Sequence, residues 1–136
     1  MLINDIQDEI IEEFTSFDDW MDRYSLLIEY GNGLDSFSES DRTDENLIRG
    51  CQSKVWFTAE MRDGRVVYRG DSDAILVKGI VALLIRVLSD RTPKEIVNTK
   101  LYFIDEINLR EHLSPTRSNG LNAMLRKMIE YAMAYK

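Results

Sequence analysis

Cys51 and His112 attract attention first, because each is the only residue of its type in the chain. A cysteine thiolate is a nucleophile, and nearby cations favour it over the thiol, so Arg49 and Lys54 favour a reactive Cys51. Cys51 also follows Gly50 in a turn-like segment just before a strand pattern. The alternative is a buried and inert core thiol, which is a common environment for a free cysteine.

His112 lies near a predicted helix end, where a histidine commonly caps backbone carbonyls. A cysteine hydrolase would need His112 as the base for Cys51, and nothing in the sequence brings the two together. Asp71 and Asp73 could form a carboxylate pair for acid–base chemistry, but they match a helix N-cap cluster better. Lys78 interrupts an apolar run, so either it faces a pocket or its stem covers the core while its amine reaches solvent.

The composition excludes several classes of protein. One cysteine and one histidine cannot form an intrachain disulfide, a Cys/His zinc site or an iron–sulfur cluster held by this chain alone. We therefore expect no metal and no cofactor on this chain. A net charge of -7 disfavours nucleic acid as a partner. The longest apolar stretch, 79–85, is too short to span a bilayer, and the opening residues lack a signal-peptide pattern. We expect a cytoplasmic protein.

Two amphipathic helices are predicted in the first third of the chain, over 4–14 and 18–30. Gly31 and Gly33 are expected to end the second helix, because glycine most easily adopts the left-handed conformation that closes helices. The polar segment 34–46 is predicted to be a loop.

The hydrophobic period then changes from helical to alternating, which predicts a half-buried strand over 54–61. Asp63-Gly64 favours a type I′ hairpin turn, because such a turn needs positive φ at both positions. Residues 65–69 supply the return strand, and 47–49 are a candidate third strand.

Helices are predicted again after the hairpin. The run from 74 to 88 is apolar nearly all round, which indicates a central buried helix that starts at the N-cap cluster 71–73. Thr92-Pro93 and Ser114-Pro115 each begin a further helix, since proline is favoured at the first helical position. This order predicts one α+β domain over 1–136, with a small antiparallel sheet of about three strands packed against several helices.

Three segments carry a resemblance to a known family. They are Gly-Cys-Gln-Ser-Lys-Val-Trp-Phe at 50–57, Asp-Ser-Asp-Ala-Ile-Leu-Val-Lys-Gly at 71–79 and Leu-Ser-Pro-Thr-Arg-Ser-Asn-Gly-Leu at 113–121. Together, in this order, they resemble the SufE family of sulfur-acceptor proteins along nearly the whole chain. Asp90 and Asn108 stand where the family favours glycine, and asparagine is the next most tolerant residue of positive φ.

The resemblance implies an α+β fold in which Cys51 is the catalytic persulfide acceptor. The sulfur donor would be a SufS-like cysteine desulfurase, which carries the pyridoxal phosphate and is stimulated by the acceptor. The recipient would be a SufBCD-like iron–sulfur scaffold complex. Cluster scaffold proteins of similar fold have three cysteines and this chain has one, which favours transfer over cluster assembly. We expect support for the cysteine loop and its pocket from these residues: Gly50, Gln52, Asp73, Lys78 and Arg117.

Gly50 as a hinge, with Val55 and Phe57 nearby, suggests that Cys51 is tucked away at rest and swings out when a partner docks. Three alternatives stay open. The chain could be a paralogue that serves a different desulfurase pathway, or a binding module in which Cys51 is a buried core thiol. It could also be a cysteine hydrolase that uses His112.

Overall fold

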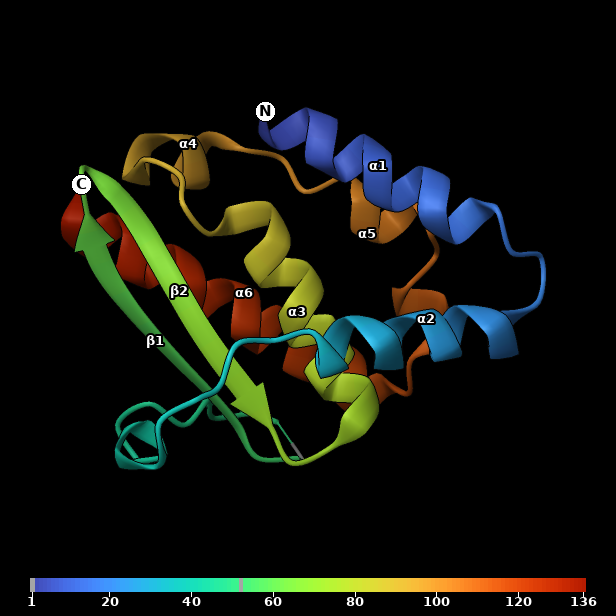
Figure 1. Ribbon diagram of the computed structural model, residues 1–136, viewed down its shortest axis with the longest axis horizontal. Coiled ribbons are helices and arrows are strands. Elements are labelled where there is room, and N and C mark those ends of the chain that lie inside the picture. Colours follow the sequence, from blue (N-terminus) through green and yellow to red (C-terminus); the bar gives the residue numbers. More distant parts are fainter. Residues whose placement is uncertain (1, 52) are drawn as a thin grey trace.

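The computed structural model describes residues 2–51 and 53–136 (Figure 1). Helix α3 lies between the β-hairpin on one side and helices α1 and α2 on the other, and α6 runs behind the hairpin. The predicted α+β class is confirmed. The elements in chain order are α1 (Ile3–Thr15), α2 (Trp20–Asn32), the 3-10 helix η1 (Glu39–Asp41), β1 (Val55–Arg62), β2 (Arg65–Ser72), α3 (Ile75–Leu88), α4 (Pro93–Asn98), α5 (Phe103–Glu106), the 3-10 helix η2 (Arg110–His112) and α6 (Pro115–Tyr135).

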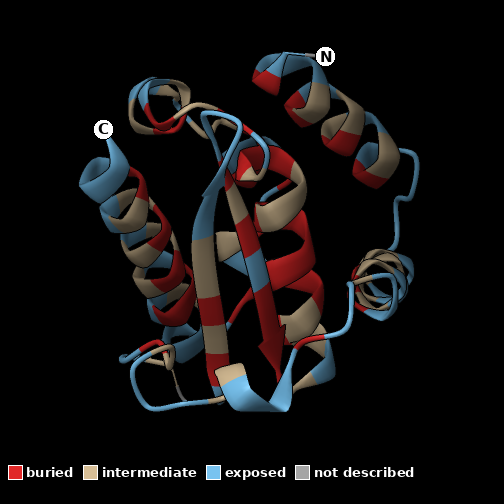
Figure 2. Ribbon diagram, turned by 60° about the vertical axis from the view of Figure 1, so that its left-hand side comes forward, coloured by how far each residue is buried: buried red, intermediate tan, exposed pale blue. Residues whose placement is uncertain are grey.

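Helix α3 forms the centre of the core, as its sequence predicts. Nine of its residues are buried, including Ile80, Leu84 and Val87, and Figure 2 shows it buried along nearly its whole length. An apolar helix of this kind must be covered on most sides. The hairpin and α6 cover it from one direction, and α2 covers it from the other.

Helix α2 extends two residues further than predicted, because Gly31 lies inside it and does not end it. Gly33 is the C-cap residue. A Cβ at Gly31 would lie 3.0 Å from the backbone nitrogen of Gly79, and a Cβ at Gly79 would lie 2.2 Å from the carbonyl oxygen of Leu27. The two glycines therefore let the backbones of α2 and α3 touch.

The hairpin turn is confirmed, since Asp63 and Gly64 have φ values of 53° and 80°. Strand β2 is three residues longer than predicted and ends at Ser72. Asp71 and Ser72 thus belong to the strand, and α3 begins after Ala74. The predicted N-cap cluster is wrong, because Ala74 is the N-cap residue and no side chain caps α3. The side chains of Ser72 and Asp73 bond to the backbone of Lys54, just before β1.

The described sheet has two strands where about three were predicted. Residues 47–49 contribute only one bridge, Leu47 to Trp56, because the chain turns sharply at Gly50, whose φ is +93°. Other groups cover the edges of this small sheet. The hydroxyls of Tyr131 and Tyr135 donate to carbonyls of β1, and Ser89 Oγ accepts from the backbone of β2. Such caps satisfy groups that would otherwise be exposed on edge strands.

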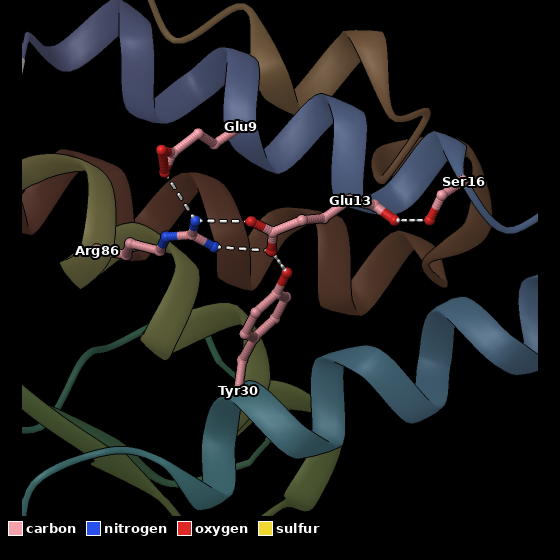
Figure 3. A network of polar contacts seen from close by, with 5 residues as sticks. All are labelled: Glu9, Glu13, Ser16, Tyr30 and Arg86. Atoms are coloured by element: carbon pink, nitrogen blue, oxygen red, sulfur yellow. Dashed lines mark hydrogen bonds and ion pairs between the residues drawn. The ribbon is translucent and has the colours of Figure 1, made fainter.

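Helix α1 is fixed to the rest of the fold through a polar network (Figure 3). Arg86 of α3 pairs with Glu13 at 2.8 Å and with Glu9 at 3.2 Å, and the Tyr30 hydroxyl of α2 donates to Glu13. Glu13 therefore joins α1 to both α2 and α3. In the described part of the chain, no helix is both long enough and apolar enough to cross a bilayer.

Candidate functional site

The loop that carries Cys51 is held at both ends by hydrogen bonds. On one side the backbone N–H of Ile48 donates to the carbonyl of Val55 at 2.8 Å. On the other, the N–H of Lys54 donates to Asp73 Oδ1 at 3.0 Å, and Ser72 Oγ donates to the Lys54 carbonyl at 2.9 Å. The described residues of the loop tip lie between these two anchors.

Cys51 is half-buried at the edge of a small cavity of about 60 Å³ between the loop, α3 and α6. Its thiol donates to the carbonyl oxygen of Gly120 across 3.7 Å, a length that suits the large sulfur atom and its weak S–H donor. Apolar side chains of α3 and α6 form the floor of the cavity. Its full lining is Cys51, Ser53, Val77, Ile80, Thr116, Arg117, Gly120 and Met124.

Burial raises the pKa of the Cys51 thiol above its ordinary value. The sequence predicted the opposite effect from Arg49 and Lys54, and that expectation is wrong. Arg49 lines a separate open groove beside α6, and Lys54 is exposed and does not line the described cavity. Loss of hydration at the sulfur therefore dominates, and it keeps the resting residue as a thiol.

The predicted supporting residues are divided by the structure into two groups. Arg117 lines the cavity, Asp73 anchors the loop through Lys54, and Gly50 provides its sharp turn. Lys78 is elsewhere. Its Nζ lies 3.4 Å from Asp71 Oδ1, and Arg42 pairs with the other oxygen of that carboxylate at 2.7 Å.

Lys78 thus belongs to an ion-pair cluster of the fold and does not line the described cysteine cavity. Its stem lies against Gly31 and its side chain is 36% exposed, which fits the expected stem over the core, with Asp71 as an added partner of the amine. Gln52 lies outside the described residues.

His112 is not brought to Cys51. Its ring stacks on Trp20 with 3.7 Å between ring centroids, and its carbonyl accepts from the Tyr24 hydroxyl at 2.9 Å. Among the described residues that line the cavity there is neither a histidine nor a carboxylate. The described residues also contain no group of three His, Cys, Asp or Glu side chains placed to hold a metal ion.

Gly120 and Ser72 are functional candidates that sequence reasoning did not assign. A glycine inside a helix costs roughly 1 kcal/mol relative to alanine, so Gly120 in the predicted last helix indicates a packing constraint. Its contact with Cys51 explains that constraint. For Ser72 no such signal exists, because a serine three residues before the start of a helix is common.

The fold and the site define a class of protein: a small α+β protein with one cysteine on an anchored loop, seated against a helix. The chain belongs to the SufE family, since the family's sequence model, described as an Fe-S metabolism associated domain, matches residues 8–132. The family is associated with iron–sulfur metabolism.

Two curated relatives support the family membership. One is an uncharacterized SufE-like protein of Synechocystis sp. (strain ATCC 27184 / PCC 6803 / Kazusa), 41% identical over 128 residues, which covers 94% of this chain and 80% of the relative. Another is an uncharacterized SufE-like protein of Rhizobium meliloti (strain 1021), 39% identical over 126 residues, which covers 89% of this chain and 90% of the relative.

A solved structure shares the fold. The solution structure of a hypothetical protein from Thermus thermophilus aligns with a TM-score of 0.78 at 21% identity, and the alignment covers 96% of this chain and 95% of that one. The two positions without the expected glycine fit the same fold, since Asp90 and Asn108 have φ values of 61° and 56°.

Proposed function

We propose that this chain accepts sulfane sulfur on Cys51 from a pyridoxal-phosphate cysteine desulfurase, stimulates that enzyme, and delivers the sulfur to iron–sulfur assembly machinery. The observation that carries the proposal is the seat of the only cysteine. Cys51 lies on an anchored loop, half-buried beside a cavity with room for little more than a few atoms. Membership of a family associated with iron–sulfur metabolism supports the same role.

The transfer itself is a displacement at sulfur. The Cys51 thiol first loses its proton to solvent. The thiolate then attacks the terminal sulfur of the donor's cysteine persulfide, a new S–S bond forms at Cys51, and the S–S bond of the donor breaks. The donor cysteine leaves as its thiolate, and the persulfide proton stays with the transferred sulfur. Sulfane sulfur changes carrier without net oxidation, so this chain needs no cofactor of its own, and the pyridoxal phosphate belongs to the donor.

Several features of the site favour a carrier over a hydrolase. A hydrolase needs a base within hydrogen-bond distance of the nucleophile, and the described cavity lining offers none. The absence of a second cysteine means that a persulfide on Cys51 cannot be resolved into an internal disulfide. We place the activity in the cytoplasm, where thiols are kept reduced.

The decisive experiment is intact mass after incubation with an active cysteine desulfurase, its pyridoxal phosphate and L-cysteine. The wild type should gain whole sulfur atoms that are lost on reduction, and Cys51→Ser should gain none while keeping its fold. Sulfur on the Cys51→Ser variant, or no gain by the wild type with several active desulfurases, would overturn the proposal. A gain with only one desulfurase would identify the pathway that a paralogue of this family serves.

A further inference from the structure

We propose that Gly120 is a positioning residue of the acceptor site: its missing side chain makes the seat that holds the Cys51 sulfur inside the fold at rest. This inference rests on the proposed function of Cys51 and adds the group that controls access to it. It assigns to Gly120 a role in setting how far the sulfur is exposed at rest.

The contacts of Gly120 carry the inference. A Cβ built on Gly120 would lie 3.2 Å from Cys51 Sγ and 3.8 Å from Cys51 Cα and Cβ, and these are its three nearest neighbours. Outside its own helix backbone and chain neighbours, the three atoms nearest to that added carbon therefore all belong to Cys51. The carbonyl of the same residue accepts the hydrogen bond of the thiol at 3.7 Å. Gly120 thus meets the cysteine with both its Cα face and its backbone oxygen.

The helix α6 itself does not require a glycine at position 120. Gly120 is the sixth residue of a 21-residue helix and is buried, and its φ is not in the left-handed region. Alanine would be the better helix former by roughly 1 kcal/mol. The space taken by the Cys51 side chain is the constraint that the structure shows at this position.

An added methyl group would displace the sulfur in one direction. Val77 and Ile80 of α3 and Met124 of α6 line the inner part of the cavity, and tightly packed apolar side chains resist movement. Cys51 is held less firmly, because the described backbone hydrogen bonds of its loop are at the two ends and its thiol makes one weak bond, to Gly120 itself. Gly120→Ala should therefore push Cys51 outwards, towards solvent.

The first test measures the rate of Cys51 alkylation by iodoacetamide at neutral pH in the folded protein. Gly120→Ala should react at least about threefold faster than the wild type, because the thiol gains both access and hydration. The matched control is Asn119→Ala, a neighbour on the same helix that does not line the cavity, which should react at the wild-type rate. Equal rates for Gly120→Ala and the wild type would overturn the inference.

A second measurement decides the matter even if Gly120→Ala folds poorly. In a Cys51→Ala background the sulfur is gone, so Gly120→Ala should raise Tm through its better helix propensity. In the Cys51 background the same substitution should raise Tm less, or lower it. An equal effect of Gly120→Ala in both backgrounds, or failure of the double variant to fold, would show that Cys51 is not the constraint.

The two proposals fail separately. If the wild type takes no sulfur from active desulfurases, the carrier function fails, and the alkylation and Tm comparisons still decide the role of Gly120. If the wild type and Gly120→Ala both accept sulfur and their Cys51 thiols are alkylated at the same rate, the carrier function is supported and the role of Gly120 is refuted. If both proposals are correct, Cys51 of the Gly120→Ala variant should also accept sulfur faster than the wild type from inorganic polysulfide, a donor that needs no docking.

Discussion

Gly79 of α3 lies so close to Leu27 of α2 that a Cβ on the glycine would be 2.2 Å from the leucine carbonyl oxygen. No side-chain rotation can relieve a contact between two backbones. We expect Gly79→Ala to lower the free energy of unfolding by about 1–3 kcal/mol or more, the range for overpacked sites. Urea denaturation measures the change. The control is Gly33→Ala, where the nearest atom would be 3.5 Å away, and a loss of equal size there would refute the explanation.

The buried thiol predicts a specific pH profile. Because burial raises the pKa of Cys51, its thiolate fraction near neutral pH is lower in the folded protein than in the unfolded chain. The midpoint of alkylation rate against pH should therefore lie above the ordinary thiol value of about 8.5, and should return to that value in urea. A folded midpoint at or below the unfolded one would mean that cations control the sulfur after all.

The Asp73 anchor of the cysteine loop should act independently of the nearby ion pairs of Asp71. Asp73→Ala removes the acceptor for the Lys54 N–H, a bond of about 1 kcal/mol or less at this exposed site, and should speed Cys51 alkylation about two- to fivefold. Lys78→Ala is the control, because it removes a nearby charged side chain that contacts Asp71 instead of the loop. It should leave the alkylation rate unchanged, and a matching increase in both variants would place Lys78 in the loop machinery.

The network around Arg86 should contribute stability that depends on pH. The Arg86 hydrogen bond holds the pKa of Glu13 below its ordinary value, so its contribution is present above the unfolded pKa of about 4.3 and is lost as pH falls through the folded pKa. Glu13 is partly exposed, so solvent screening limits the effect to roughly 1 kcal/mol or less.

We therefore expect Glu13→Gln to lower the free energy of unfolding near pH 7, and the difference from the wild type to shrink at pH 3. Glu12→Gln on the exposed face of α1 is the control and should change little. If the difference for Glu13→Gln persisted at pH 3, packing would have to replace electrostatics as its cause.

Local signals in the sequence predicted the structure correctly where one residue or one short pattern determines the backbone geometry or the burial. The hairpin turn at Asp63-Gly64 and the buried α3 are examples, and so is the cysteine at a turn. What failed depends on contacts between distant segments. The hydrogen bond of Asp73 with Lys54 and the contact of Gly31 with α3 could not be predicted, because the pattern around each residue also fits a helix end.

The same limit explains the reversed expectation for the thiol. Proximity in sequence placed two cations beside Cys51, but most residues that line its cavity come from α3 and α6. Those helices are far away along the chain, and their packing sets the local solvation. Gly120 lies 69 positions from Cys51, so only its unfavourable place inside a helix gives any warning from the sequence.

The anchors of the cysteine loop limit how far a sulfur atom can travel. Cys51 is three positions from Ile48 and three from Lys54, and both anchor residues are bonded to neighbouring segments of the fold. Three residues of extended chain span about 10 Å at most. While the anchors hold, Cys51 stays within that length of the loop base, so the proposed transfer requires a donor that brings its persulfide to within that distance.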